Sequence, residues 1–417
     1  MTPKDWQVVS LGTICRKVTD GSHQSVPAMD QGDVPFLFVS CVRDGKILWE
    51  NAKYVSRETY SEISRGREPE PGVVLYTAVG SYGHAALVRE AGEFSFQRHI
   101  AYILPDTARV APEFLSQWLN SSQAREHADM VAVGNAQKTV TLGKLKGFPL
   151  FLPPLPEQRK IAAILSSVDE AIDKTQAVID QLGVVKKAMM QDLLTKGLPG
   201  RHTRFKQTEI GMVPEEWEVV PFGDLCTKIV DGVHKKPDYV KEGIPFVTVK
   251  NLTAGEGISF EDLNYVSEAD HAAFIKRAHP EKGDVLLTKD GTLGIPRVVE
   301  TDRVFSIFVS VAVLKPRRDR IDAWYMRFAL ESPGIVAHFG IVNAGQALKH
   351  IHLVDMRATP CPVPRMDEQR EIAACLRSIV ERSESERATL IELQELKSAL
   401  MSVLLTGEVR VTPDVGV

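Results

Sequence analysis

Hydrophobic residues between Pro153 and Gly197 recur at alternating intervals of four and three residues along the chain. This heptad spacing predicts a long helix that packs along its length against another helix. The spacing returns 211 residues later, where position 161 becomes 372, so the partner helix is expected in the same chain. The predicted contact positions are Ile161, Leu165, Val168, Ile172, Ile179, Leu182, Met189 and Leu193 in the first helix, and Ile372, Leu376, Ile379, Leu390, Leu393, Leu400 and Leu404 in the second.

The repeat extends well beyond the two helices and keeps the same offset. Matching residues include Trp6 and Trp217, Gly21 and Gly232, and Glu157 and Glu368. An offset held over so many positions indicates a tandem duplication with few net insertions. We therefore expect two copies of one unit, each a globular domain followed by a long helix.

Each globular part alternates short apolar runs with Gly, Pro and Asp, which is typical of short strands separated by turns. The predicted strands are 36–39, 73–77, 99–104 and 148–151 in the first copy and 246–249, 285–288 and 304–314 in the second, and the predicted helices are 112–124 and 323–332. The predicted fold class is α+β, with two mixed α/β domains in tandem. The predicted boundaries are 1–152 for the first domain, 153–200 for the first long helix, 201–363 for a linker and the second domain, 364–410 for the second long helix, and 411–417 for the tail.

Two lysines at heptad positions decide how the long helices should pair. Parallel pairing in register would set Lys186 against Lys397 and bring like charges together. Antiparallel pairing sets Lys186 near Ile379 and Lys397 near Val168, where each stem packs and its ammonium group reaches water. We therefore expect an antiparallel coiled coil, in which residues 157–195 span roughly 58 Å at ~1.5 Å per residue.

Composition is that of an ordinary globular protein, with 417 residues, 44% hydrophobic and 25% charged. No stretch has the length and apolarity of a signal peptide or a membrane span, so we expect a protein that does not enter membranes. The five cysteines lie far apart without metal-ligand spacing, which favours reduced thiols in the cytoplasm. The net charge of −4 argues only mildly against binding a polyanion, because local basic faces decide nucleic-acid binding.

Sequence patterns of catalysis are absent. The chain has no GxxxxGK[ST] phosphate loop and no Asn/Asp-Pro-Pro-aromatic run of the kind that amino-methyltransferases use. Its histidines do not fall at metal-ligand spacings, so no catalytic residue, metal or cofactor is expected in this chain.

Polar and basic residues beside turn glycines are the candidates for contact with DNA. On loops, such side chains reach base edges or phosphates. The candidates are Lys17, His23, Gln24, Arg43, Ser81, Tyr82, His84, Arg98, Asn135, Gln137 and Lys138 in the first copy, and Lys228, His234, Lys235, Lys236, Lys289, Thr292, Asn343, Gln346, Lys349 and His350 in the second.

Each set of candidates also has a structural interpretation. Asp20-Gly21 and Asp231-Gly232 are typical turn residues, the Asn/Gln segments suit a β-turn before a strand, and single surface arginines are usually solvated. The triplets beginning at Glu157 and Glu368 open the long helices, where an acidic residue in the first turn has a structural role.

Taken together, these motifs resemble the specificity subunits of type I restriction-modification systems. The resemblance is carried by PPLPEQRKIAAILSSVDEAI and its copy PVPRMDEQREIAACLRSIV, and by KDWQVVSLGTIC and its copy VPEEWEVVPFGDLC. It covers essentially the whole chain.

The resemblance implies a non-catalytic DNA-recognition subunit. Each globular part would be a target recognition domain that reads one half of a bipartite, asymmetric double-stranded DNA site. The paired helices would set the spacing and dock two methyltransferase subunits, and motor-nuclease subunits would join through the complex. S-adenosylmethionine, ATP and Mg would be bound by the partners, and the complex would work in a prokaryotic cytoplasm on the nucleoid.

Three other interpretations remain, the third being a self-contained nuclease or methyltransferase, against which the missing motifs weigh. The partner could be a single polypeptide that fuses methyltransferase and nuclease. From a different class, the chain could be a coiled-coil scaffold that binds only protein, in which case no salt-dependent DNA association is expected.

Overall fold

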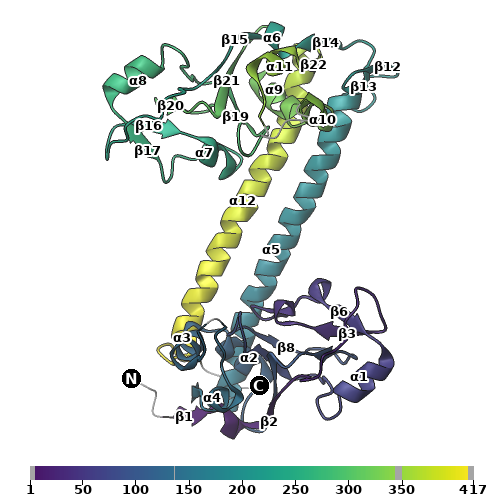
Figure 1. The fold of residues 1–417 in the computed structure, drawn as a ribbon, viewed down its shortest axis with the longest axis vertical. Coiled ribbons are helices and arrows are strands. Elements are labelled where there is room, and N and C mark those ends of the chain that lie inside the picture. The colour runs from purple at the N-terminus through teal and green to yellow at the C-terminus, as the bar shows by residue number, and fades with distance from the viewer. Residues whose placement is uncertain (1–4, 136, 343–349, 412–417) are drawn as a thin grey trace, which may run out of the picture. The chain divides into compact units, whose positions relative to one another are not determined.

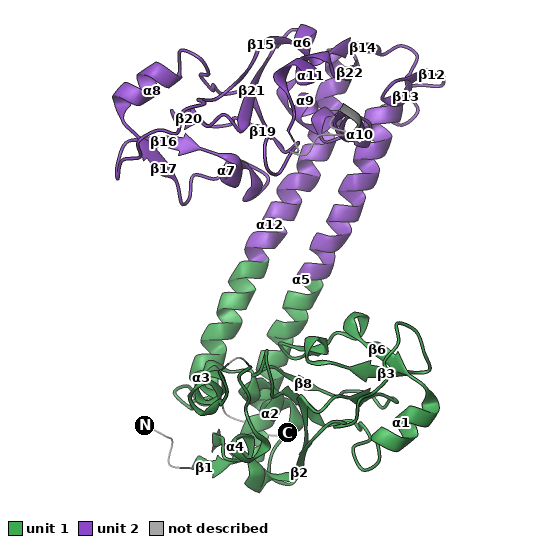
Figure 2. Ribbon diagram, in the orientation of Figure 1, with its two compact units in different colours: residues 1–174, 390–417 green, residues 175–389 purple. Residues whose placement is uncertain are grey.

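The computed structural model describes residues 5–135, 137–342 and 350–411. It divides into two compact units, residues 1–174 with 390–417 and residues 175–389 (Figure 2). Each unit holds one globular domain together with parts of two long helices, α5 (Leu155–Lys196) and α12 (Met366–Leu404) (Figure 1). The predicted domain boundaries stay predictions, because these units divide both helices instead of setting them apart.

In unit 1 the domain is built on a four-stranded antiparallel sheet with the order β2 (Cys15–Asp20), β10 (Ile100–Pro105), β7 (Val74–Thr77) and β8 (Ala85–Leu87). A second, mixed sheet has the order β6 (Lys53–Val55), β3 (Val34–Leu37) and β9 (Ser95–Phe96). Two strand pairs complete the domain, β1 (Gln7–Ser10) with β11 (Pro149–Leu152) and β4 (Val42–Arg43) with β5 (Lys46–Ile47). Its helices are α1 (Arg57–Ile63), α2 (Pro112–Leu119), α3 (Ser122–Val131) and α4 (Leu142–Lys146).

Unit 2 repeats this topology. Its sheets have the orders β15 (Cys226–Asp231), β21 (Val311–Pro316), β18 (Val285–Thr288), β19 (Pro296–Val298), and β17 (Asn264–Val266), β16 (Ile244–Val247), β20 (Ser306–Ile307), with β14 (Glu218–Pro221) paired to β22 (Pro360–Val363). Its helices are α6 (Phe222–Leu225), α7 (Val249–Thr253), α8 (Glu268–Phe274), α9 (Ala323–Leu330), α10 (Pro333–Val342) and α11 (Leu353–Ala358). The predicted duplication and the α+β class are confirmed.

Several predicted elements differ from those observed. The single strand predicted at 304–314 is two strands, because β20 pairs with β16 whereas β21 joins the large sheet. The helix predicted at 112–124 is interrupted, since the Ser121 side chain accepts a hydrogen bond from Ala124 N and starts α3. Pro333 likewise begins α10 after α9. The expected linker contains a hairpin, β12 (Phe205–Thr208) and β13 (Gly211–Pro214).

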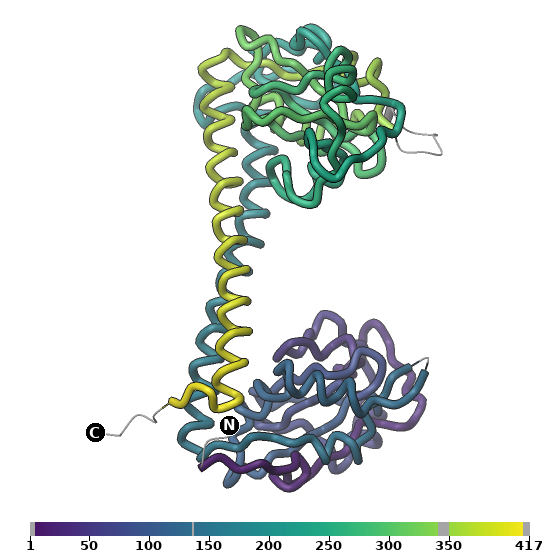
Figure 3. The backbone as a smooth tube through the Cα atoms, turned by 90° about the vertical axis from the view of Figure 1, so that its left-hand side faces the viewer, coloured from purple at the N-terminus to yellow at the C-terminus, as the bar shows by residue number. Residues whose placement is uncertain are grey.

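The long helices are antiparallel, as predicted. In unit 1, Ile161 and Leu165 near the start of α5 share a core with Leu404 at the end of α12, and the two segments lie side by side in Figures 1 and 3. In unit 2, Leu193 near the end of α5 shares a core with Ile372 near the start of α12. Every predicted contact residue is buried or half-buried. Leu182 and Leu393, which belong to neither domain's hydrophobic core, are half-buried, whereas Ile179 is buried.

The two seam lysines behave differently from the prediction. The Lys186 Nζ lies 3.0 Å from Glu256 and 3.6 Å from Glu331, so its ammonium is paired with the globular domain of unit 2. The Lys397 Nζ lies 2.6 Å from Asp169 of α5. The expectation that both ammonium groups extend into water is wrong, because carboxylates lie within reach of each stem.

A buried glutamate fastens the start of α5 to its domain. The Glu157 carboxylate accepts a hydrogen bond from Trp6 Nε1 at 3.1 Å and is paired with Arg410 at 2.7 Å. Next to it, the Gln158 side chain donates to the carbonyl of Arg109 and accepts from Ala111 N at 2.8 Å. The triplet that begins at Glu157 therefore has the structural role expected for it. Its bonds join the start of α5 to three separate parts of the chain.

The same cluster of a buried glutamate, a tryptophan and a cation, called the glutamate lock below, occurs in unit 2 with a different cation. Glu368 accepts from Trp217 Nε1 at 3.3 Å, and its second partner is the His202 imidazole, at 2.9 Å. The imidazole also bonds Glu216 at 2.7 Å. Burial alone would lower the pKa of His202, but the hydrogen bonds to Glu368 and Glu216 outweigh burial and raise it. The cation paired with Glu157 is therefore a permanently charged arginine, whereas the cation paired with Glu368 is a titratable histidine.

We expect the stability of unit 2 to depend on the protonation of His202. Because its folded pKa is raised, the stabilisation is fully present below the unfolded pKa of about 6.5 and is lost as pH rises through the folded value. An NMR titration of His202 should give a pKa above that of a free imidazole. Glu368→Gln should bring this pKa down.

The lock of unit 1 provides the internal control. Arg410 stays charged at every accessible pH, so amide exchange near Trp6 should not change between about pH 6 and pH 9 beyond its intrinsic pH dependence. Amides near Trp217 should lose protection over that range. An equal change in amide protection near Trp6 and near Trp217 would contradict the assignment of the pH dependence to His202.

Candidate nucleic-acid interface

Several candidate residues of unit 1 meet in one shallow groove. Its volume is about 300 Å³, and it lies where the loops after β3, after β7 and before β10 come together. A further loop joins them, because Gly80 N donates to Lys138 O at 3.0 Å. The groove is lined by Phe38, Val39, Ser40, Arg43, Val79, Gly80, Ser81, Gln97, His99 and Gln137. The fold therefore brings Arg43, Ser81 and Gln137 together from distant parts of the sequence.

Sequence reasoning missed three polar residues of this groove, Ser40, Gln97 and His99. Gln97 Nε2 lies 2.9 Å from His99 Nδ1, and burial lowers the pKa of His99, which favours the neutral imidazole. A neutral imidazole offers one donor and one acceptor. The signal that could have found Gln97 and His99 is the polar run that contains them directly after the buried strand β9, of which only Arg98 was selected.

Several candidates of unit 1, including Arg43 of the groove, have partners within the protein. Arg43 contacts the His84 imidazole, which also lies 3.0 Å from Asp44, and burial lowers the pKa of His84. The Tyr82 hydroxyl donates to Asp129 at 2.6 Å, and this bond raises its pKa. The same holds for Lys17, which donates to the Gly66 carbonyl. The candidates with exposed side chains are Lys17, His23, Gln24, Ser81, Arg98, Asn135, Gln137 and Lys138.

The Asp–Gly turns of both copies have a structural reason. A Cβ at Gly21 would lie 2.2 Å from the Phe96 carbonyl oxygen, and one at Gly232 would lie 2.2 Å from that of Ile307. Only glycine fits these close approaches. The turns also hold their histidines near the aspartates, with His23 Nε2 2.8 Å from Asp20.

The corresponding region of unit 2 is richer in ion pairs. Lys289 is buried, with Nζ 3.4 Å from Asp231 and 3.5 Å from Asp290, so its charge is held inside the protein. Arg277 pairs with Asp231 and lies 3.1 Å from His234. These cations hold the pKa of Asp231 below its usual range, although burial acts against them.

The remaining candidates of unit 2 differ in accessibility. Lys228 donates to the Arg277 carbonyl at 2.7 Å, and His350 is paired with Asp290. Exposed side chains are those of Lys228, His234, Lys235, Lys236 and Thr292. Asn343, Gln346 and Lys349 lie outside the described residues. Lys228 is exposed but bonded to the protein backbone, whereas Lys235 and Lys236 are exposed directly after the Asp–Gly turn.

Within residues 5–135, 137–342 and 350–411, no group of three or more His, Cys, Asp or Glu side chains has the arrangement of a metal site. No helix in the same ranges is long and apolar enough to cross a bilayer.

Comparison with known proteins gives the family. The model of the type I restriction modification DNA specificity domain matches this chain twice, over residues 3–183 and 214–395. The MjaVIII type I restriction enzyme specificity subunit of Methanocaldococcus jannaschii is 24% identical over 419 residues, which cover 98% of this chain and 94% of that protein. The EcoKI specificity subunit of Escherichia coli K12 is 20% identical over 384 residues, or 89% and 81% of the two chains.

A solved structure shares the fold. The crystal structure of the type I S subunit from M. genitalium superposes with a TM-score of 0.62 at 15% identity, over 97% of this chain and 99% of that one. The two domain matches correspond to the two structural repeats, each a globular domain followed by most of a long helix. The chain belongs to the type I restriction-modification specificity subunits, which are non-catalytic and serve enzymatic partner subunits.

Proposed function

We propose that each globular domain reads one half of a bipartite, asymmetric double-stranded DNA site. The observation that carries the proposal is the groove of unit 1, which collects polar side chains from four separate loops. Family membership supports a role in DNA specificity, and the groove supplies groups that suit base recognition. The two domains differ in these residues, so the two half-sites are expected to differ in sequence.

The chemistry of the unit 1 groove suits purine recognition in the major groove. The guanidinium of Arg43 matches the two acceptors of guanine, and the amides of Gln97 and Gln137 match the donor and acceptor of adenine. Arg98 and Lys138 are exposed beside the groove, where they suit phosphate contacts that fix register.

In unit 2 we assign phosphate contact to the exposed pair Lys235 and Lys236. The buried position of Lys289 favours a structural role, in which it neutralises Asp231 and Asp290 behind the loop. Base recognition by this domain falls to residues near Thr292 and in the 343–349 segment.

We further propose that α5 and α12 set the spacing between half-sites and dock two methyltransferase subunits. Large apolar side chains are exposed on these helices, including Val178 and Val184 on α5 and Ile391 and Leu396 on α12. Exposed apolar residues of this kind suit a protein interface. Motor-nuclease subunits would join through the complex, which would act on the nucleoid in a prokaryotic cytoplasm. S-adenosylmethionine, ATP and Mg would be held by those partners.

Methylation mapping tests the function. The chain is co-expressed with its methyltransferase subunit in a host without adenine methylation, and the genome is read by single-molecule sequencing. We expect one split, asymmetric motif methylated at adenine. Absence of such a motif from an assembled complex would sink the proposal. Assembly without salt-dependent DNA binding would instead make the chain a protein scaffold.

Variants of the groove sharpen this test. Arg43→Ala or Gln97→Ala should weaken recognition of one half-site by roughly 1–3 kcal/mol per lost bidentate contact, or about 5- to 150-fold. Arg16→Ala is the matched control, because Arg16 is an exposed arginine of the same unit outside the groove. A loss of sequence recognition at both half-sites, or at neither, would contradict the assignment of the groove to one half-site.

The spacer role predicts a change in recognised spacing. Seven residues inserted after Gln176 in α5 and after Arg387 in α12 keep both heptad patterns in step. The added ~10.5 Å of helix should lengthen the gap between half-sites by about 3 base pairs. An unchanged gap would rule out the spacer. The same insertion in α5 alone puts the helices out of step and should abolish sequence-specific methylation.

A further inference from the structure

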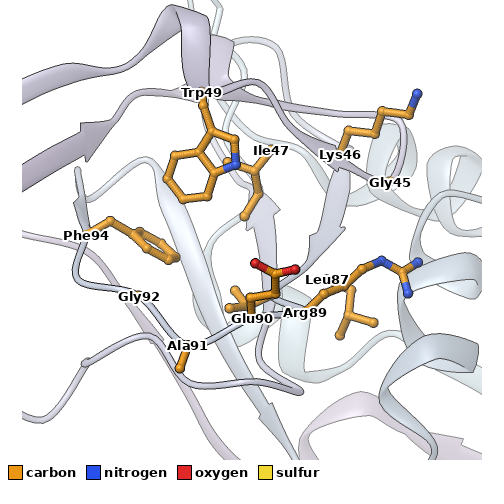
Figure 4. Close-up of a pocket in the computed structure, with 11 residues that line it drawn as sticks. Gly45, Lys46, Ile47, Trp49, Leu87, Arg89, Glu90, Ala91, Gly92 and Phe94 are labelled. Atoms are coloured by element: carbon orange, nitrogen blue, oxygen red, sulfur yellow. The ribbon is translucent and has the colours of Figure 1, made fainter. Parts of the chain in front are cut away.

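Unit 1 contains an open cavity that the DNA-recognition proposal does not use. It has a volume of about 500 Å³ and lies between the β4–β5 hairpin and the segment 87–94 (Figure 4). One wall is an aromatic pair, Trp49 and Phe94, whose ring centroids are 5.2 Å apart at an interplanar angle of 81°. Phe94 is buried, but Trp49 is 48% exposed, which leaves much of a large aromatic side chain facing solvent.

The second copy shows how such a pair is completed. The equivalent residues Phe260 and Phe305 form the same edge-to-face contact, with centroids 5.6 Å apart at 74°. There the Arg303 guanidinium lies over the Phe260 ring, 4.8 Å from its centroid. This is a cation–π contact, in which the negative face of the ring attracts the cation. Unit 2 therefore fills its aromatic site with its own arginine.

Unit 1 lacks that arginine. Position 303 corresponds to position 92, which is a glycine, and a Cβ built there would meet no heavy atom within 4 Å. The backbone at Gly92 does not adopt the left-handed region, so a side chain at this position would introduce no backbone strain. The cavity therefore corresponds to the position that the Arg303 guanidinium occupies in unit 2, and in unit 1 this position in front of Trp49 is open.

The charged groups around the cavity favour the binding of a cation that belongs to another molecule. In Figure 4 the Glu90 carboxylate points toward Trp49 and Ile47, whereas the charged ends of Lys46 and Arg89 point away from the indole. Lys46 is paired with Asp173 of α5, which also places the rim of the cavity beside that long helix. An arginine entering here would meet an aromatic face and a carboxylate, and both interactions are favourable.

We propose that this cavity receives an arginine side chain of the methyltransferase subunit. The inference rests on the proposed docking of that subunit to α5 and α12, and it adds a specific contact at the edge of the docking surface. Unit 2 completes the equivalent site internally with Arg303, so this contact exists at one of the two units. The two methyltransferase subunits would then be held by chemically different contacts.

The test is to fill the cavity from within. Gly92→Arg should place a guanidinium over Trp49, as Arg303 lies over Phe260, and so exclude the partner's arginine. We expect it to weaken binding of the purified full-length chain to its methyltransferase subunit about 2- to 30-fold, the range of a single cation–π contact. Trp49→Ala should weaken binding to a similar extent.

Gly143→Arg is the matched control, because Gly143 is an exposed glycine of the same unit with open space around it. It adds the same charge away from the cavity and should bind as the wild type does. Thermal unfolding of each variant checks that Gly92→Arg remains folded, and Glu90→Gln provides a second variant of the cavity with little change in volume.

The outcomes separate the two proposals. If the wild-type chain binds the methyltransferase subunit and the folded Gly92→Arg chain binds equally well, the assignment of the cavity is overturned and the docking proposal stands. If the wild-type chain does not bind that subunit at all, the docking proposal fails, and the assignment of this partner fails with it. Weakening by Gly92→Arg, Trp49→Ala and Glu90→Gln, but not by Gly143→Arg, would support both.

Discussion

The rest of the structure depends on one buried carboxylate in each copy. Glu157 and Glu368 sit in the first turn of a long helix, almost without solvent, and each is satisfied by a tryptophan from its own domain. A buried carboxylate without partners is strongly unfavourable, so each domain must meet its helix in one orientation. The other partner of Glu157 is Arg410, which follows the end of α12, and that of Glu368 is His202, which follows the end of α5. These bonds therefore also fix how α5 and α12 pair.

Local sequence was sufficient for the architecture. The heptad positions and the constant offset predicted two domains and two long helices, because these follow from periodicity alone, whereas the antiparallel pairing was predicted from the charges of two heptad lysines. The lysine argument led to the right direction for a partly wrong reason, since Lys186 and Lys397 are paired with carboxylates. Ion pairs such as these join residues far apart in sequence, and no periodic pattern records them.

The candidate interface was less predictable than the fold. Arg43, Ser81 and Gln137 were selected as separate surface residues, and only the folded loops show that they share a groove. Lys289 was selected by charge and position, but it is buried and paired with two aspartates, one of them 58 residues away. Polarity in a sequence predicts that a residue needs partners. It does not tell whether those partners are protein or ligand.

The division of the chain into units has a consequence for synthesis. Unit 2 is one continuous stretch, residues 175–389, whereas unit 1 combines residues 1–174 with 390–417. Domains fold as they leave the ribosome, with the N-terminal one usually first. Here the first domain to be made lacks Leu404 and Arg410 until the last part of the chain emerges, so its core and its glutamate lock are completed after those of the second. The domain that is synthesised first is therefore the one whose structure is completed last.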